Sequence, residues 1–351
     1  MIALILAGGV GSRFWPLSRE DNPKQFLPIV SSDSMIRLTV DRLLKKVSIK
    51  DIYIVTAANQ VEMVKHHLPD LNTQNIIVEP FGMNTAPCIA LSLAWLENKY
   101  PEDETMLVAA ADHLITDTKE FYNCVDIAQD TARQDMLVTF GITPSYPSTS
   151  YGYIESGELI GNKSFQVVSF KEKPDQKTAM MYLETDNFFW NSGMFIWNLK
   201  TIRKAFINLQ PAIWELLEKI KADWQRYGKG SDFTSLYKQM PRLPVDIGIM
   251  EKSDNIAVIP SSFGWSDVGG WKALHDLSTK DKNNNVSKRD FLAIDSSDNY
   301  IFSDKLISLI GVNNLVIVET EDSLLIADKD RSEEVKKLVG YLKENNMNGY
   351  L

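Results

Sequence analysis

Short apolar runs alternate with amphipathic stretches over about the first 140 residues of the chain. Ile2 to Leu6 is a continuous apolar run that ends at a glycine cluster, a pattern typical of a parallel strand buried on both faces of its sheet. Similar runs follow it, at Ile52 to Thr56, Ile76 to Val78, Met106 to Ala110 and Leu137 to Phe140. Between these runs apolar residues recur at helical spacing, as in Met35, Leu38 and Leu43, and in Ala86, Ile89, Ala90, Leu93 and Leu96 after the cap residue Asn84. The alternation predicts an open α/β sheet, mixed but mostly parallel, in which ligands bind beyond the carboxyl ends of the strands.

The pattern changes after Thr143 to Ser150, a loop rich in Pro, Ser and Thr. Beyond it strand-like pieces mix with helices, at Gly152 to Ile154, Phe165 to Phe170 and Met194 to Trp197, and we expect Trp214, Leu217 and Ile220 to pack in a core. Asp276 to Asp290 is the most polar and turn-rich stretch, so we place a boundary there between a domain of residues 1–280 and one of residues 288–351. The second domain is predicted to be a small β unit of helix-like or roll-like form, closed by a helix from about Ser332 to Asn345. Its expected strands are Phe291 to Ile294, Tyr300 to Phe302, Leu306 to Ile310, Leu315 to Val318 and Leu324 to Ala327.

Composition narrows the class of partner. Against 37 Lys and Arg stand 46 Asp and Glu, a net charge of −9, which disfavours nucleic acids and anionic membrane surfaces as partners. The two cysteines, Cys88 and Cys124, are far apart and form no C-x-x-C pair, so neither a disulfide framework nor a zinc ribbon is expected. The N-terminal apolar run lacks a basic flank and no apolar stretch approaches a membrane span, so we expect a cytoplasmic protein.

The first predicted strand leads into a glycine-rich loop with basic residues nearby. The sequence reads Leu6-Ala7-Gly8-Gly9-Val10-Gly11-Ser12-Arg13-Phe14-Trp15-Pro16-Leu17, and Pro23-Lys24-Gln25-Phe26 follows. The glycines allow backbone N–H groups to close around an anion, and both Arg13 and Lys24 are near enough in sequence to reach the same phosphates. The loop is not a P-loop, because no Gly-Lys-Ser/Thr follows. It also fits the dinucleotide pattern poorly, because Phe14 stands where the third glycine belongs.

This loop resembles the signature of the sugar-nucleotide pyrophosphorylases, and its version here is most similar to their mannose-1-phosphate guanylyltransferase branch. Further blocks match that family in the same order along nearly the whole chain. They are Glu79-Pro80 with Asn84-Thr85-Ala86-Pro87, Ala111-Asp112-His113, Tyr151-Gly152-Tyr153-Ile154, Phe170-Lys171-Glu172-Lys173-Pro174, Trp190-Asn191-Ser192-Gly193-Met194-Phe195, Met250-Glu251-Lys252-Ser253 and Trp265-Ser266-Asp267-Val268-Gly269-Gly270-Trp271. The resemblance implies the Rossmann-like fold of nucleotide-diphospho-sugar transferases, in a monofunctional form without the isomerase domain of bifunctional relatives.

The resemblance implies that the chain transfers GMP from GTP to mannose 1-phosphate, giving GDP-mannose and pyrophosphate. The sugar phosphate would attack the α-phosphorus in line, assisted by Mg²⁺ or another divalent cation. Asp112, just past a predicted strand, and Asp267, in a turn beside Trp265, are implied to hold the metal. Arg13 and Lys24 would stabilise the triphosphate and the departing pyrophosphate. No H-E-x-x-H pair or G-x-S-x-G elbow occurs in the sequence, and none is needed, because a sugar 1-phosphate is already an anion near pH 7.

The other matching blocks are implied to bind the nucleotide and the sugar phosphate. The expected nucleotide site is Leu6, Ala7, Gly8, Gly9, Gly11, Ser12, Arg13, Glu79, Asn84, Thr85, Ala86 and Asp112. The expected sugar-phosphate site is Gly152, Glu172, Lys173, Asn191 and Asp267, with Lys173 on the phosphate. Judged without the resemblance, Lys171-Glu172-Lys173 on a strand places 171 and 173 on one face and is more typical of a solvated edge.

Departures from the family pattern leave the substrate less certain than the reaction. Met83 stands where a basic residue is common, Ser148 and Ser150 stand where Glu and Gly usually precede Tyr-Gly-Tyr, and two alanines precede Asp112 in place of Leu-Pro. One alternative is a related enzyme that uses another hexose 1-phosphate or nucleotide. Another is a non-catalytic paralogue that binds a GDP-sugar and regulates a partner, and a NAD(P) oxidoreductase is a distant third. The C-terminal β unit is a candidate surface for a homodimer.

Overall fold

The structure, a computed structural model, describes residues 1–9 and 11–351 and divides into two compact units. Unit 1 comprises Met1–Gly8, Val40–Ala111 and Ile115–Trp265. Unit 2 comprises Gly9–Thr39, Asp112–Leu114 and Ser266–Leu351. Each unit is therefore assembled from segments that lie far apart in the sequence. Val10, part of the predicted glycine loop, lies outside the described residues.

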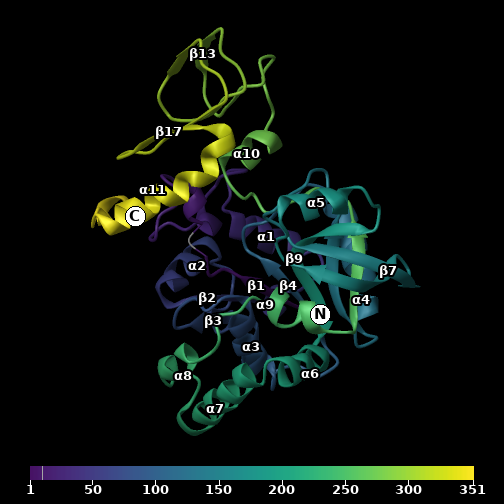
Figure 1. Cartoon of the computed structure of the whole chain (residues 1–351). Helices are drawn as coiled ribbons and strands as arrows, with labels where there is room; N and C mark the ends of the chain where they lie inside the picture. The colour runs from purple at the N-terminus through teal and green to yellow at the C-terminus, as the bar shows by residue number, and fades with distance from the viewer. Residues whose placement is uncertain (10) are drawn as a thin grey trace. The chain divides into compact units, whose positions relative to one another are not determined.

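A mixed nine-stranded sheet forms the framework of unit 1 (Figure 1). Its order is β3 (Ile76–Glu79), β2 (Ile52–Ala57), β1 (Ile2–Leu6), β4 (Thr105–Ala110), β9 (Phe188–Asn198), β6 (Leu137–Ile142), β10 (Ile256–Ser261), β8 (Ser164–Lys171) and β7 (Tyr153–Gly161). β1 pairs in parallel with β2 and β4, and β2 with β3. β9 runs antiparallel to both β4 and β6 and so separates this block from the parallel pair of β6 and β10. β7 and β8 complete the sheet as antiparallel strands.

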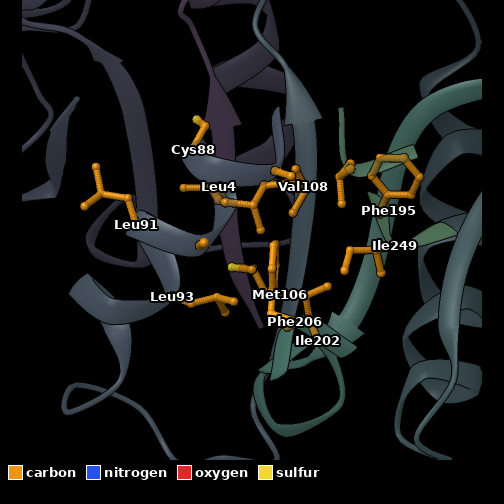
Figure 2. Packing of buried hydrophobic residues seen from close by; sticks show 14 of the residues in the cluster. Leu4, Cys88, Leu91, Leu93, Met106, Val108, Phe195, Ile202, Phe206 and Ile249 are labelled. Atoms are coloured by element: carbon orange, nitrogen blue, oxygen red, sulfur yellow. The ribbon is translucent and has the colours of Figure 1, made fainter. Parts of the chain in front are cut away.

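The apolar core of unit 1 lies between this sheet and its helices. Alternate residues of the strands, such as Leu4 of β1 and Val108 of β4, cluster with the helices α3 (Thr85–Leu96), α6 (Leu199–Leu209) and α7 (Pro211–Tyr227). Figure 2 shows Leu4 and Val108 next to each other in this cluster, to which Leu91 and Leu93 of α3 also belong. Because α3 is buried along almost all of its length, its first turn is held firmly against the rest of unit 1.

The remaining elements of unit 1 are further helices. They are α2 (Val61–His67), α4 (Thr118–Ala132), α5 (Gln176–Leu183), α8 (Thr234–Lys238), α9 (Val245–Gly248), η3 (Ile49–Asp51), η4 (Ala58–Gln60), η5 (Thr73–Asn75) and η6 (Met250–Lys252). In three elements the boundary between the two units falls inside the element. They are α1 (Met35–Leu43), β5 (Leu114–Ile115) and β11 (Trp265–Ser266).

The C-terminal part of unit 2 is a stack of short parallel strands. β12 (Val286–Ser287), β14 (Tyr300–Phe302) and β16 (Leu315–Glu319) pair in parallel, as do β13 (Phe291–Ile294) and β15 (Ile307–Ile310). The buried Asn299 ties successive coils together, since its amide donates to Asn285 Oδ1 (3.0 Å) and its Oδ1 accepts from the Leu315 N–H (2.9 Å). The antiparallel β17 (Leu324–Asp328) follows, and then η7 (Lys329–Glu334), α11 (Val335–Glu344) and η8 (Asn348–Tyr350).

The N-terminal part of unit 2 packs on this stack through aromatic side chains. Phe14 of η1 (Ser12–Phe14) lies edge-on to Trp271 of α10 (Trp271–Leu277), with ring centroids 5.0 Å apart. Both belong to one buried cluster with Tyr300 and Val335. Phe14, which breaks the dinucleotide glycine pattern, is therefore a core anchor. The other short helix here is η2 (Lys24–Phe26).

The mixed α/β sheet and the small C-terminal β unit confirm the predicted fold class. Both cysteines are buried free thiols. Within the described ranges, no helix combines the length and the apolar character that a membrane crossing needs. The boundary between residues 1–280 and 288–351 stays a prediction; in the contact-based division, residues 288–351 share their unit with Gly9–Thr39 and the segment from Ser266.

Candidate active site

The glycine loop of unit 2 has a backbone shape that only glycine adopts easily. Gly11 has φ +70°, and a Cβ at this position would lie 2.4 Å from the Cβ of Lys24. Polar side chains hold the loop, because Ser18 Oγ donates to the Gly11 carbonyl (2.7 Å) and Gln25 Nε2 donates to the Gly9 carbonyl (2.8 Å). Nothing lies within 4 Å of a Cβ built on Gly9. The loop therefore packs tightly against Lys24 at Gly11 and leaves open space at Gly9.

Lys24 connects the two predicted metal-binding aspartates. Its side chain is almost fully buried, and Nζ donates to Asp112 Oδ2 (2.7 Å) and to the backbone carbonyl of Asp267 (2.7 Å). Burial acts to raise the pKa of the Asp112 carboxyl, but the charges of Lys24 and His113 and the hydrogen bond from Lys24 outweigh burial and lower that pKa below its ordinary value. Asp112 is therefore ionised at neutral pH.

A cleft of about 240 Å³ in unit 2 contains these groups. It is lined by Gly11, Ser12, Arg13, Phe14, Lys24, Asp112, His113, Asp267, Val268, Gly269 and Lys336. The structure thus brings together all four predicted catalytic residues. Arg13 is held at one side, where its Nε lies 3.9 Å from Glu333 Oε2. The Arg13 Nε is buried and makes no hydrogen bond within the described protein.

Unit 1 contains seven of the predicted nucleotide-binding residues, namely Leu6, Ala7, Gly8, Glu79, Asn84, Thr85 and Ala86. Gly8 comes shortly after β1 and packs against Glu79. A Cβ on Gly8 would lie 2.9 Å from Glu79 Oε1. The buried Glu79 accepts a hydrogen bond from the Tyr237 hydroxyl at its other oxygen (2.7 Å). Burial raises the pKa of Glu79 above its ordinary value, although the donors Tyr237 and Met83 N–H oppose this. Met83 is buried in the apolar core.

The other predicted nucleotide-binding residues of unit 1 lie at the start of α3 or at the end of β1 and just after it. Asn84 caps α3 by accepting from the Thr85 N–H (2.9 Å), and Ala86 N–H donates to the Leu243 carbonyl (3.0 Å). Thr85 Oγ1 accepts from the Val245 N–H (2.8 Å). Leu6 ends β1, and Thr56 Oγ1 donates to the carbonyl of Ala7.

Four of the five predicted sugar-phosphate residues, Gly152, Glu172, Lys173 and Asn191, form a cluster in unit 1, whereas the fifth, Asp267, lines the cleft of unit 2. A Cβ on Gly152 would lie 2.5 Å from Glu172 Oε2 and 3.4 Å from Asn191 Cβ, so these three residues are in close contact. The Asn191 N–H also donates to the Gly152 carbonyl (2.8 Å). Lys173 donates to Glu172 Oε1, which places its ammonium beside the same cluster.

Of residues 171–173, Lys171 alone lies on a strand, so the alternative of a solvated strand edge does not describe Glu172 and Lys173. β8 ends at Lys171, and Lys173 has φ +47°, a left-handed conformation that no strand contains. The Glu172 N–H donates to Glu251 Oε1 (2.9 Å) and so leaves the strand ladder. The chain turns at this point, and the side chains of Glu172 and Lys173 therefore meet in an ion pair and do not point to opposite faces.

Comparison with known proteins decides the family. The Nucleotidyl transferase family model matches residues 2–284, and a model described as MannoseP isomerase/GMP-like beta-helix domain matches residues 290–342. The chain belongs to the nucleotidyl transferase family. It is 44% identical to a mannose-1-phosphate guanylyltransferase of Salmonella muenchen, over 99% of this chain and 74% of that protein. It is 37% identical to the xanthan biosynthesis protein XanB of Xanthomonas campestris pv. campestris, over 98% of this chain and 73% of that protein.

A solved structure supports the same family assignment. It is described as mannose-1-phosphate geranyltransferase from Thermus thermophilus. It has a TM-score of 0.88 and 29% sequence identity, and covers 97% of this chain and 99% of that chain. The likeness extends over both the sheet region and the C-terminal β unit. The family resemblance expected from the sequence motifs is therefore confirmed.

The sequence motifs missed one half-buried acid of this nucleotidyl transferase, Asp246. Asp246 accepts a hydrogen bond from Asn191 Nδ2 (2.7 Å). Burial and the nearby charge of Glu172 raise the pKa of Asp246 from 3.8 to about 6, against the opposing hydrogen bond from Asn191. The segment that carries it also binds α3 through Val245. Its sequence signal was its position four residues before the matching block at Met250, which by itself does not reveal a contact with Asn191.

Proposed function

We propose that this nucleotidyl transferase makes GDP-mannose and pyrophosphate from GTP and mannose 1-phosphate, and so supplies an activated sugar for polysaccharide synthesis. The observation that carries the proposal is the identity of 44% to a mannose-1-phosphate guanylyltransferase over 99% of the chain. The cleft of unit 2 agrees with it, because it combines Gly11 of the glycine loop, three Lys and Arg side chains and two carboxylates. GTP and mannose 1-phosphate are accordingly the proposed partners.

Charge neutralisation and positioning are the main tasks in this reaction. The sugar phosphate is an anion before it reacts and needs no general base. Arg13, with an Nε that has no hydrogen-bond partner in the described protein, is proposed to bind the triphosphate and the pyrophosphate that leaves. Lys24 is proposed to stabilise the same phosphates while it fixes the position of Asp112 through their ion pair. The open space at Gly9 suits a phosphate that approaches the backbone N–H groups.

A divalent metal ion fits the donor set of this cleft. The part of the chain that the structure describes holds no group of three or more His, Cys, Asp or Glu side chains suited to a metal. Mg²⁺, however, commonly takes one or two carboxylates and completes its shell with substrate phosphates and water. Asp112 and Asp267 line the same cleft, and Asp112 is ionised. Bound by them, Mg²⁺ would supply positive charge to the reacting phosphates.

The unit 1 cluster of Gly152, Glu172, Lys173 and Asn191 is proposed to bind the sugar phosphate. Gly152, Glu172 and Asn191 offer a carboxylate and an amide side by side, the kind of groups that recognise sugar hydroxyls. The ammonium of Lys173 lies beside Glu172, so it is proposed to bind the phosphate of the sugar. Glu79 and the first turn of α3 are proposed to shape the nucleotide site.

Unpaired cysteines and nucleotide substrates agree with a cytoplasmic location. The C-terminal β unit remains the proposed surface for a homodimer.

The test is pyrophosphate release with GTP, mannose 1-phosphate and Mg²⁺. Asp112→Asn keeps an acceptor for Lys24 but removes the carboxylate, so we expect release to fall by at least about 100-fold in a variant that still folds. Asp267→Asn should behave alike. Asp304→Asn is the matched control, because Asp304 is an exposed aspartate of the same unit. Near-normal turnover by both site variants at saturating Mg²⁺ would contradict the metal assignment. A panel of other nucleotides and hexose phosphates tests the substrates, and faster release with another pair would replace GTP or mannose 1-phosphate.

A further inference from the structure

The unit 2 cleft contains a lysine that the family motifs do not include. Lys336 belongs to α11, near the C-terminus, yet it lines the same cleft as Arg13, Lys24, Asp112 and Asp267. The two other Lys and Arg side chains that line this cleft come from the first 24 residues. The C-terminal β unit therefore contributes a charged side chain to the cleft that is proposed to bind phosphates.

The sequence around Lys336 fixes which side of α11 faces the cleft. Its neighbour Val335 is buried in the aromatic cluster of unit 2, which prevents the helix from rotating. Glu333, three residues before Lys336, forms the ion pair with Arg13, and residues three apart lie on the same face of a helical segment. Both lysines are exposed, and of the two it is Lys336 that lines the cleft, while Lys337 pairs with Glu334. Neighbouring lysines thus have different environments.

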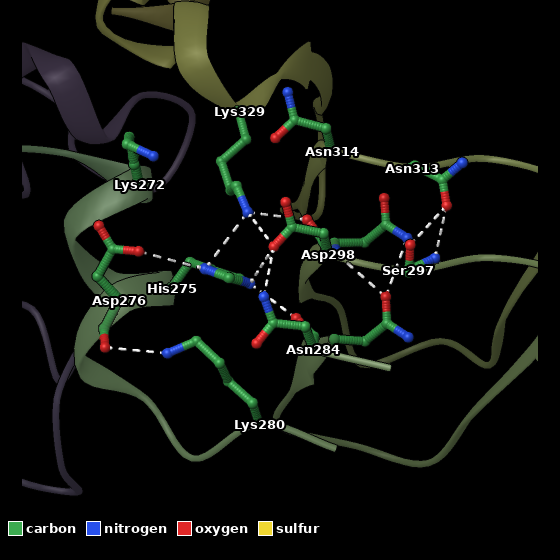
Figure 3. Close-up of polar contacts among 12 residues, drawn as sticks. Lys272, His275, Asp276, Lys280, Asn284, Ser297, Asp298, Asn313, Asn314 and Lys329 are labelled. Atoms are coloured by element: carbon green, nitrogen blue, oxygen red, sulfur yellow. Dashed lines mark hydrogen bonds and ion pairs between the residues drawn. The ribbon is translucent and has the colours of Figure 1, made fainter. Parts of the chain in front are cut away.

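Polar contacts anchor η7 and α11 within unit 2. Lys329, at the start of η7, is buried and donates to the backbone carbonyl of Asp298 (3.0 Å), and its ammonium lies 2.7 Å from Asp298 Oδ1. Figure 3 shows Lys329 between Asp298 and His275 of α10, with His275 Nδ1 3.4 Å from its Nζ. With its proton on Nε2, His275 donates to the Asn284 carbonyl (2.8 Å) and accepts from Lys329. The helix that carries Lys336 thus begins at a well-fixed point.

The far end of this segment is attached directly to the loop region. Trp15 Nε1 donates to the Tyr350 carbonyl (2.7 Å), and Lys343 donates to Glu20 Oε1 (2.7 Å). The residues that follow Arg13 are therefore joined to the C-terminal segment on the other side of Lys336. These contacts hold Lys336 and the glycine loop in one compact unit.

We propose that Lys336 binds the terminal phosphates of the nucleoside triphosphate and the pyrophosphate released from it, as a third cation beside Arg13 and Lys24. The proposal rests on the proposed function, which places the triphosphate in this cleft. The carboxylates of Asp112 and Glu333 pair with Lys24 and Arg13 and partly offset the positive charge of the cleft. A pyrophosphate group carries several negative charges, so a further cation at the edge of the cleft stabilises it. The C-terminal β unit is then part of the substrate site as well as a packing partner.

The test compares Lys336→Met with Lys337→Met in the full-length chain. The probe is inorganic pyrophosphate in the presence of Mg²⁺, with its dissociation constant measured by calorimetry. Because Lys336 is exposed at the edge of the cleft, we expect binding about tenfold weaker in Lys336→Met, which corresponds to about 1.4 kcal/mol. Lys337→Met should bind as the wild type does, and Lys336→Arg should restore most of the affinity. In turnover, the KM for GTP should rise while the KM for mannose 1-phosphate stays constant.

Each outcome bears on the proposal. Equal pyrophosphate affinity for Lys336→Met and Lys337→Met would overturn it, as would a wild-type protein that does not bind pyrophosphate. A wild type that binds pyrophosphate but turns over no mixture of GTP and mannose 1-phosphate would refute the proposed substrates alone. Lys336→Gln serves as the second variant should Lys336→Met unfold at a lower temperature, and the same comparison with Lys337→Met then applies.

Discussion

Gly11→Ala is expected to damage both stability and activity, because it acts on the backbone next to Lys24. Alanine at φ +70° costs about 1 to 2 kcal/mol, since the left-handed region brings Cβ close to the backbone. The new Cβ would also lie 2.4 Å from Lys24 Cβ, whereas real Cβ contacts are essentially never under 3.0 Å, so one of the two must move by at least 0.6 Å. Overpacking of this kind costs about a further 1 to 3 kcal/mol. We therefore expect a loss of about 2 to 5 kcal/mol of unfolding free energy.

The same displacement should lower the rate of the reaction. Lys24 Nζ is held at 2.7 Å from both Asp112 Oδ2 and the Asp267 carbonyl, so a shift of its Cβ disturbs both aspartates. A misplacement of about 1 Å in an active site can cost on the order of 100-fold in rate. Urea unfolding measures the first effect and single-turnover pyrophosphate release the second. Gly9→Ala is the stability control, because its Cβ meets open space. Equal unfolding free energies for Gly11→Ala and Gly9→Ala would refute the argument from backbone strain and packing.

The remaining predictions concern stability. The pKa of Asp246 is raised from 3.8 to about 6, so the folded state favours its neutral form and the protein loses stability as the pH rises through this window. Asp246→Asn keeps the acceptor for Asn191 and removes that loss, so relative to the wild type it should gain up to about 3 kcal/mol between pH 3.8 and about 6 in urea titrations; parallel pH profiles would contradict this. Gly340→Ala, within α11 and with nothing within 4 Å of its Cβ, should raise stability by about 0.5 to 1 kcal/mol, and a lower Tm would count against it.

Local patterns predicted most of the strands but could not predict their arrangement. β1, β13 and β14 have the predicted bounds, because each is a short apolar run between glycine or polar turns. The antiparallel insertion of β9 between β4 and β6 has no local signal, since pairing depends on residues far apart in sequence. β10 was missed altogether, although Ile256–Ser261 is mainly apolar. Its Pro260 lowers the strand signal, yet the strand still pairs in parallel with β6.

The same limit applies to the candidate site, where the sequence motifs identify some residues and miss others that matter only through a tertiary contact. The family motifs identify Arg13, Lys24, Asp112 and Asp267, and the cleft brings all four together, although their roles remain predictions. They do not identify groups whose position depends on a tertiary neighbour. Asp246 matters through Asn191, and Glu79 is held by Tyr237, which lies 158 residues further along the chain. Motifs therefore find residues that bind ligands more readily than residues that hold them in place.

The acidic balance of the chain and its proposed polyanionic substrates are compatible for a reason of scale. A net charge of −9 is spread over the surface, and at physiological salt such charges are screened beyond about 8 Å. This negative charge disfavours the binding of nucleic acids, because their backbone needs many basic contacts over a wide face of the protein. A triphosphate occupies one cleft and contacts side chains at hydrogen-bond distance, where screening is weak. Arg13 and Lys24 from one segment of unit 2 and Lys336 from another contribute positive charge there. The net charge therefore excludes a class of partner without describing the site.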